Sequence, residues 1–272
     1  MRRRALAAGG AALVCAVLLF PVWWMLVTAV APPDDLRAYP PVFLPMHPSF
    51  AAFHAVLFDR PMLRWIANSL AVAAGSTALT MLLGVLGGYA LSRFSSRAVR
   101  AVGLSVLLAK MIPTTLLVIP LYVMFRQYGL LSTLTSAALA HCTVTIPFAI
   151  WMLKAYFDSI PAELEEAAAI DGCTPLGALW RIVLPVSLPG LGATALYAFI
   201  LSWNEFAFSR TLLFSEPDNW TVTIGIASIK GEYIVAWNEI MAASAIVAVP
   251  VIIVFLWLER YLVVGLTAGA QK

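Results

Sequence analysis

Residues 66–91 read IANSLAVAAGSTALTMLLGVLGGYAL, a run without a charged side chain. A helix needs about 20 predominantly apolar residues to cross the roughly 30 Å hydrocarbon core of a bilayer. Because lipid offers no hydrogen-bond partner to backbone N–H and C=O groups, a segment that spans a bilayer in this way must be helical. The run therefore predicts a transmembrane helix.

The rest of the chain has the same character. It has 272 residues, 62% hydrophobic and 11% charged, whereas a soluble domain carries about 25% charged residues. Folding in water would leave large apolar patches exposed. We therefore predict an all-α integral membrane protein with six transmembrane helices. The predicted spans are Leu6–Ala31, Ile66–Leu91, Ala101–Phe125, Thr133–Leu153, Leu188–Phe208 and Ile240–Leu262.

Basic residues predict the orientation of these spans. With the N-terminus in the cytoplasm, ten Lys and Arg residues lie inside and six lie outside, in agreement with the positive-inside rule. The cluster Arg93, Arg97 and Arg100 contributes most to this bias. Both termini are then cytoplasmic. The apolar run at residues 6–31 is long for a signal peptide, so we expect an uncleaved first span, with cleavage as the alternative.

The segments between the spans suggest a division of the chain. Residues 32–65 contain seven prolines, which exclude long helices. We predict that residues 1–65 form a first transmembrane helix and a proline-rich outer loop. Residues 66–272 are predicted to form the main transmembrane domain. It would include a long inner segment at 158–189 and another outer loop at 213–238.

The inner segment has the features of two short helices. Residues 158–185 read DSIPAELEEAAAIDGCTPLGALWRIVLP. The glutamates suit the first turns of a helix, where the helix dipole favours negative charge, and Gly172 suits the end of that helix. Thr174 followed by Pro175 is typical of a second helix start.

The same residues could make a docking surface. Glu166 lies beside three alanines, and small side chains let another surface approach the backbone while the carboxylate pairs with a basic residue. Spacing predicts one apolar face on the second helix, formed by Leu176, Leu179, Trp180 and Val183. On the residues alone, a docking elbow and a solvated loop both remain open.

This segment resembles the EAA motif of binding-protein-dependent ABC importer permeases, and especially that of the maltose-type second permease. The matching residues are Glu166, Ala167, Ala168, Asp171, Gly172, Ile182, Leu184, Pro185 and Pro189. Other stretches resemble the third span, the fifth span and the cytoplasmic tail of that subfamily. These stretches are Met111-Ile-Pro113, Ile119-Pro-Leu-Tyr122, Tyr128-Gly-Leu130, Trp203-Asn204-Glu205-Phe206 and Gly265-Leu-Thr-Ala-Gly-Ala270. The resemblance covers about residues 66–272.

The resemblance implies a permease subunit that forms half of the translocation path of an ATP-driven carbohydrate importer, for a di- or oligosaccharide. It implies a heterodimer with a homologous second permease, two ATPase subunits and an extracytoplasmic sugar-binding protein. The chain itself would carry no cofactor, and ATP and Mg would bind to the partner ATPase. The location would be the inner (cytoplasmic) membrane.

The resemblance also implies roles for single residues. The EAA elbow would be the coupling helix seated in a groove of the ATPase, with Glu166 paired to an arginine there and Gly172 allowing the turn. The tail would reach between the ATPases through Gly265, Thr267 and Gly269. The tail ends in Gln271-Lys272, where the family more often has Val-Lys-Gly, so its last contacts remain open.

Polar residues inside predicted spans are further candidates, because an unpaired ionisable group in a bilayer is costly. Met111, Thr114, Asn204 and Glu205 are our candidates for lining the pore or gate. For Asn204 and Glu205, pairing with the partner permease is the alternative. We predict that His141 makes a hydrogen-bonded helix contact, and that Lys110 snorkels or balances a carboxylate.

Several function classes are disfavoured. The chain has no GxxxxGK[ST] loop, so we do not expect it to hydrolyse ATP, and it has neither HExxH nor GxSxG. Its three cysteines form no CxxC pair, which argues against a zinc site or disulfide framework. The modest net charge of +3 argues against nucleic acid. An ABC importer for glycerol phosphodiesters or polyamines, and an ion-coupled secondary transporter, remain alternatives.

Overall fold

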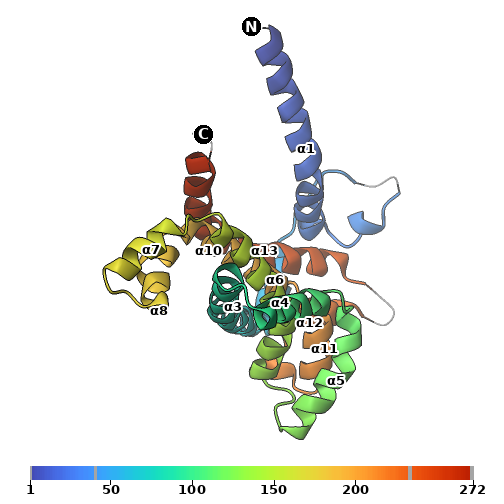
Figure 1. Ribbon diagram of the computed structural model, residues 1–272. Helices are drawn as coiled ribbons and strands as arrows, with labels where there is room; N and C mark the ends of the chain where they lie inside the picture. Colours follow the sequence, from blue (N-terminus) through green and yellow to red (C-terminus); the bar gives the residue numbers. More distant parts are fainter. Residues whose placement is uncertain (1, 40–41, 232–234, 270–272) are drawn as a thin grey trace. The chain divides into compact units, whose positions relative to one another are not determined.

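The computed structural model describes residues 2–39, 42–231 and 235–269, without the side chains of residues 2, 3, 5–7 and 260–269. Within these ranges the chain is all-helical, as predicted, with no strand and one isolated bridge between Lys230 and Val235 (Figure 1). Backbone contacts divide the chain into two compact units. The first is Met1–Ile66 with Ile224–Pro250, and the second is Ala67–Thr223 with Val251–Lys272.

The first unit contains the N-terminal helix and the proline-rich segment. It includes α1 (Arg2–Val30), η1 (Asp35–Arg37), α2 (Ala51–His54) and η2 (Ala55–Asp59). The proline-rich segment forms only these short helical pieces, as its prolines predict. Arg60 fastens the end of this segment to the start of α13 (Trp237–Gly269), since its Nη2 donates to Glu239 Oε2 at 2.6 Å.

Gly225 marks a close approach inside the first unit. It lies in α12 (Val222–Ile229), and a Cβ at this position would collide with the indole ring of Trp65, which is buried. We expect Gly225→Ala to destabilise the protein by about 1–3 kcal/mol, because a packed core resists an added methyl group. Thermal unfolding in detergent would measure the change.

Gly75→Ala is the matched control for that substitution. A Cβ at Gly75 meets only Ala138 Cβ, at an ordinary distance of 3.9 Å, and replacing glycine by alanine inside a helix gains up to about 1 kcal/mol. Equal stability of the Gly225→Ala and Gly75→Ala proteins would contradict the predicted collision.

The second unit is built around α3 (Met62–Arg93) and α6 (Leu134–Asp158). These helices approach closely where α3 carries Gly84 and Gly88, because a Cβ on either glycine would touch Ala149 or Leu153 of α6. Small residues spaced by four are typical of close helix contacts in membranes. The other elements of this unit are α4 (Arg97–Lys110), α5 (Thr114–Gln127), α7 (Glu163–Ile170), α8 (Pro175–Ala178), η3 (Leu179–Val183), α9 (Leu184–Val186), α10 (Leu188–Trp203), α11 (Ala207–Leu213) and η4 (Pro217–Asn219).

Four helices of the described chain are long and apolar enough to cross a membrane. They are Ala8–Val30, Met62–Arg93, Leu134–Asp158 and Trp237–Glu259. Two bent helix pairs raise the number of candidate spans to six if each pair is one span. The four helices agree with the first, second, fourth and sixth predicted spans within a few residues at most ends.

The third predicted span, Ala101–Phe125, consists of two helices with a sharp bend between them. Helix α4 ends at Lys110, α5 begins at Thr114, and the two are bent by 103°. Pro113 has no N–H to donate, and its ring disfavours a helical conformation at the preceding residue. The backbone at Pro113 is extended, with ψ of 129°, so the chain turns there.

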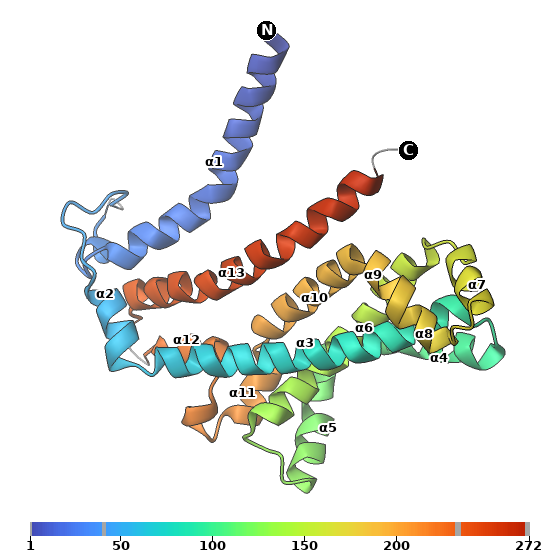
Figure 2. The same ribbon diagram turned by 90° about the vertical axis from the view of Figure 1, so that its left-hand side faces the viewer.

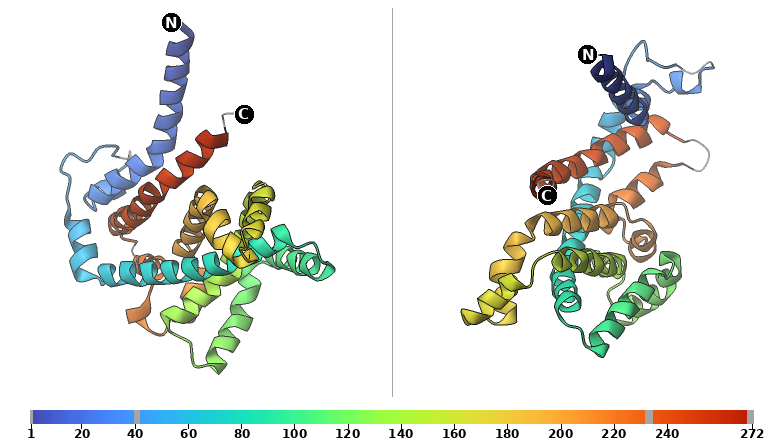
Figure 3. Two further views of the ribbon diagram at one scale, coloured as in Figure 1. Left: turned by 60° about the vertical axis from the view of Figure 1, so that its left-hand side comes forward. Right: turned by 45° about the horizontal axis from the view of Figure 1, so that its top comes forward.

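The fifth predicted span, Leu188–Phe208, is shorter than expected. Helix α10 ends at Trp203, and α11 begins at Ala207 after a break. At its other end α10 is bent by 83° from the helical segment Pro175–Val186. Figures 2 and 3 show this segment, in yellow, at one end of α10.

Candidate functional site

The segment that resembles the EAA motif forms two short helices joined by a tight turn, as predicted; we call residues 158–189 the elbow. Helix α7 ends at Ile170, and Gly172 follows with φ of +83°. Gly172 N donates to Ala169 O at 3.0 Å, and Cys173 N donates to Ala168 O at 2.9 Å. These two bonds make a Schellman motif, which closes a helix through a glycine in the left-handed conformation.

The second helix of the elbow starts where the sequence predicts. Thr174 Oγ1 accepts a hydrogen bond from Gly177 N at 3.1 Å, and Pro175 occupies the first turn. The hydroxyl satisfies one open N–H group of the helix start, and the proline has no N–H that needs a partner. The chain stays helical to Val186, with a π-helical stretch at Leu179–Val183.

The elbow packs on the ends of α3 and α6 through an apolar cluster. The cluster consists of Val85, Tyr89, Leu153, Phe157, Ile160, Leu179 and Val183. Leu179 and Val183 are fully buried, as the predicted apolar face requires, whereas Leu176 and Trp180 are more than half exposed. The apolar face is therefore narrower than the sequence predicts.

One side of α7 is left open. Glu163, Glu166, Ala167 and Ile170 are exposed, Ile170 to 87%, and their spacing puts them on one face of the helix. Glu166 makes no hydrogen bond or ion pair with any side chain that the structure describes. This face offers a carboxylate beside small and apolar side chains.

The remaining residues of the motif are distributed along the elbow. Ala168 is buried, Asp171 and Pro185 are exposed, and Ile182 and Leu184 are half-buried. The neighbour of Glu166, Glu165, is turned inward and bonded to α3. Sequence reasoning assigned Glu165 no role beyond helix charge.

The pore candidates lie at the two breaks in the helices of the second unit. Met111, 76% exposed, and the half-buried Thr114 flank the bend between α4 and α5. Asn204, exposed, lies at the end of α10, and its Nδ2 donates to Ile200 O at 2.9 Å. The ammonium of Lys110 lies 5.0 Å from the centroid of the Phe148 ring.

Glu205 is part of a buried polar cluster between α6, α10 and α11. His141 is buried and makes hydrogen-bonded helix contacts, as predicted. Its Nε2 lies 3.0 Å from Glu205 Oε2, and its Nδ1 lies 2.7 Å from Ser202 Oγ. Glu205 also accepts hydrogen bonds from Phe208 N at 2.8 Å and Ser209 N at 3.0 Å. Its carboxylate therefore holds the start of α11.

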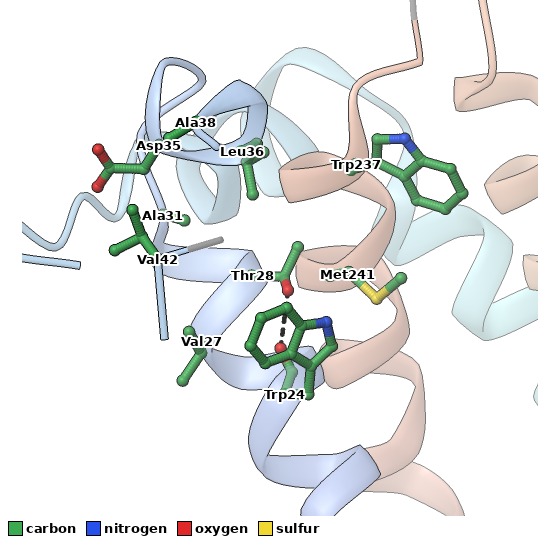
Figure 4. A pocket seen from close by; sticks show the side chains of 10 residues that line it. All are labelled: Trp24, Val27, Thr28, Ala31, Asp35, Leu36, Ala38, Val42, Trp237 and Met241. Carbon is green, nitrogen blue, oxygen red and sulfur yellow. Dashed lines mark hydrogen bonds between the residues drawn. The ribbon is translucent and has the colours of Figure 1, made fainter. Parts of the chain in front are cut away.

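The tail candidates Gly265, Thr267 and Gly269 lie in the last turns of α13, where side chains are outside the described part of the structure. The first unit contains a cavity of about 420 Å³ (Figure 4). Trp24 and Thr28 of α1 face Trp237 and Met241 of α13 across it, and Thr28 Oγ1 donates to Trp24 O at 2.8 Å. Its walls are mainly apolar side chains.

Comparison with known proteins agrees with the resemblance. The sequence profile of the family described as binding-protein-dependent transport system inner membrane component matches residues 39–267. The chain belongs to this family. The predicted family and inner-membrane location are confirmed, and the chain is an inner-membrane permease component of a binding-protein-dependent transport system.

Relatives in this family align over most of the chain. A sulfoquinovosyl glycerol transport permease of Agrobacterium fabrum is 36% identical over 92% of this chain and 87% of that protein. A diacetylchitobiose uptake permease of Streptomyces coelicolor is 33% identical, over 93% and 91%. A trehalose/maltose transport permease of Thermococcus litoralis is 36% identical, over 76% and 75%.

Solved structures show the same fold at lower identity. A chain of a bacterial ABC transporter involved in the import of the polysaccharide alginate superposes with a TM-score of 0.79. The two chains are 23% identical, and the match covers 96% of this chain and 98% of that one. A chain of an inward-facing methionine ABC transporter superposes with a TM-score of 0.60 at 20% identity, over 74% and 94%.

Proposed function

We propose that the chain is one of the two permease subunits of an ATP-driven carbohydrate importer and that its elbow is the coupling element. The observation that carries the proposal is the open face of α7, where Glu166 stands beside Ala167 and Ile170. The names of the three relatives, all transporters of sugars or glycosides, support a carbohydrate as the substrate.

The proposed topology has six spans, with each bent pair counted as one. Both termini and the elbow are cytoplasmic, in keeping with the excess of Lys and Arg on that side. Residues 1–65 supply the first span and an outer loop, and residues 66–272 supply the permease domain with its coupling loop at 158–189. The outer loop at 213–238, which contains α12, faces the sugar-binding protein.

The proposed mechanism is a rigid-body switch driven from outside the chain. Glu166 pairs with an arginine of an ATPase subunit, which binds ATP and Mg, while Gly172 keeps the turn narrow enough to enter the groove of that subunit. Closure of two ATPase subunits then moves the helices of this chain and of a homologous second permease. Such switches need contacts that differ between the two states. The tail from Gly265 through Thr267 to Gly269 adds a contact between the ATPases.

The path for the substrate lies at the breaks in the helices. Met111 and Thr114 at the first bend, and Asn204 at the end of α10, line it in this proposal. Exposed polar groups and irregular backbone at membrane depth are tolerated where they face a water-filled cavity. Glu205 acts beside them by fixing the start of α11 through Phe208 and Ser209.

Uptake by the assembled importer in proteoliposomes tests the function. With the binding protein outside and ATP inside, we expect labelled di- or oligosaccharide to accumulate only when ATP is hydrolysed. If a glycerol phosphodiester or a polyamine accumulated instead, the proposed ATP-driven mechanism would stand, but the proposed carbohydrate substrate would be wrong. Uptake that survives without ATP and is stopped by an uncoupler would overturn the proposal in favour of ion-coupled transport.

A further inference from the structure

The elbow is fastened to α3 by an ion pair away from the open face of α7. Arg93 Nε donates to Glu165 Oε1 at 2.6 Å, and the two side chains are only 17% and 14% exposed. The hydroxyl of Tyr89 donates to the other carboxylate oxygen, Oε2, at 2.6 Å. Both oxygens of Glu165 are therefore held by α3.

The same turn of α3 reaches two other parts of the elbow. Arg93 Nη2 donates to Ile160 O at 3.2 Å, just before α7. The Tyr89 hydroxyl lies 3.2 Å from Pro175 O, at the start of the second helix. Tyr89 and Arg93 are four residues apart and lie on one face of α3. This face of α3 thus contacts the residue Ile160 before α7, α7 itself and the start of α8.

Further polar contacts connect this end of α3 to α6. Ser92 Oγ accepts from Arg93 Nη1 at 3.0 Å and donates to Asp158 Oδ1 at 2.7 Å. Asp158 Oδ2 in turn accepts from Lys154 Nζ at 2.6 Å. Linked networks of this kind constrain geometry more than isolated pairs do.

Apolar packing alone does not fill the space beside these contacts. A cavity of about 280 Å³ lies between the end of α3 and the elbow, lined by Tyr89, Arg93, Glu165, Ala169 and Cys173 among others. On this side the elbow is held by polar contacts rather than by continuous side-chain packing. Loss of these contacts would leave room for the elbow to shift on α3.

We propose that Tyr89, Arg93 and Glu165 form a clamp, a set of positioning residues that makes α3 move when the elbow moves. The inference rests on the proposed coupling function of the elbow. Glu165 and Glu166 have different roles, because successive helix positions are about 100° apart and so have different surroundings. Glu166 is exposed at the edge of this cavity, where it can meet the ATPase, whereas Glu165 is bonded to α3 and passes the displacement to a membrane helix.

The experiment compares Arg93→Gln and Glu165→Gln with wild type in the complete importer reconstituted in proteoliposomes. Two quantities are measured: the ATPase retained on the purified permease, and the substrate transported per ATP hydrolysed. We expect the ATPase to be retained at the wild-type level and the transport ratio to fall about tenfold, within the usual range of coupling between sites. Arg97→Gln and Arg100→Gln, which alter exposed charges near Arg93 but outside the elbow, should match wild type.

Two more variants keep the test decisive if a single variant folds poorly. Tyr89→Phe keeps the ring but removes the hydroxyl, and we expect it to lower the transport ratio less than Arg93→Gln does. The double variant Arg93→Glu with Glu165→Arg restores the ion pair in reverse, so we expect it to recover part of the ratio. Recovery is incomplete because Ile160 O loses its donor and Asp158 gains a like charge nearby.

The outcomes separate the clamp from the proposed function. Unchanged transport ratios in both single variants would overturn the clamp and leave the proposed function intact. So would loss of the retained ATPase in parallel with transport, because the ion pair would then serve only to fold the elbow. Failure of the wild-type complex to couple ATP hydrolysis to uptake would instead overturn the proposed function itself.

Discussion

Glu166→Lys is expected to abolish ATP-driven uptake while the amount of permease in the membrane stays the same. The side chain is exposed on α7 and is bonded to no side chain that the structure describes, so the fold does not depend on it. Reversal of its charge would place a cation against the arginine proposed on the ATPase. Uptake, ATPase retention and membrane content, measured together, check this expectation.

Glu163→Lys provides the matched control. Glu163 is exposed on the same face of α7, one turn before Glu166. Its replacement by lysine changes the net charge of the protein by the same amount. We expect uptake to fall much less in this variant. An equal loss in both would mean that the general charge of the elbow, and not the carboxylate of Glu166, governs docking.

Two substitutions at Gly172 distinguish the effect of backbone strain from the effect of filling the space that a partner needs. The φ of Gly172 is +83°, and among the residues that the structure describes an added Cβ would meet nothing within 4 Å. Gly172→Ala should therefore cost only the left-handed penalty of about 1–2 kcal/mol and keep substantial uptake. Gly172→Arg should abolish uptake, because its side chain occupies the space proposed for the ATPase.

Gly129→Ala is the control for that comparison. Gly129 also has a positive φ, of +66°, and open space at its Cβ position, but it lies outside the elbow. Gly129→Ala and Gly172→Ala should have similar small effects on stability. Normal transport in Gly172→Arg would count directly against a docked elbow.

His141→Ala is expected to cause the largest loss of stability, about 3–5 kcal/mol, because it leaves the carboxylate of Glu205 buried without its partner. The two side chains are 1% and 13% exposed. The change also removes a partner from the hydroxyls of Ser202 and Ser209, which lie 2.7 and 3.1 Å from the imidazole nitrogens. Thermal unfolding of the purified permease in detergent would measure the loss.

Glu205→Gln should also destabilise the protein, for a different reason. Both carboxylate oxygens accept from backbone N–H groups, of Phe208 and Ser209, so a glutamine must turn its own NH₂ toward one of these donors. Lys154→Gln, which breaks the half-exposed i,i+4 pair with Asp158, should cost under about 1 kcal/mol. A loss in His141→Ala no larger than that in Lys154→Gln would contradict the buried cluster.

The sequence alone predicts the features that depend on neighbouring residues. Thr174 with Pro175 starts a helix, and Gly172 ends one, because the capping groups lie within a few positions of the N–H and C=O groups that they satisfy. Apolar length predicts the spans for a similar reason. The structure places the two helix signals, and four of the six predicted spans, where the sequence does.

Features that join distant segments are not predictable in this way. Glu205 and His141 are 64 positions apart in sequence, and neither residue indicates the other. The inward turn of Glu165 depends on where α3 ends, which fixes the position of Arg93. The bend at Pro113 has a local cause in the proline ring, but neither the proline nor the apolar length of the run predicts an angle of 103°.

Because Glu165 and Glu166 have different surroundings, the rotation of α7 about its own axis matters as much as its composition. A deletion of one residue between Pro161 and Glu165 would rotate the helix by about 100° relative to its anchored approach. Glu166 would then take the position of Glu165, and Glu165 that of Leu164, without any change in the motif itself. Random mutagenesis of this segment should accordingly tolerate many substitutions but almost no single-residue insertions or deletions.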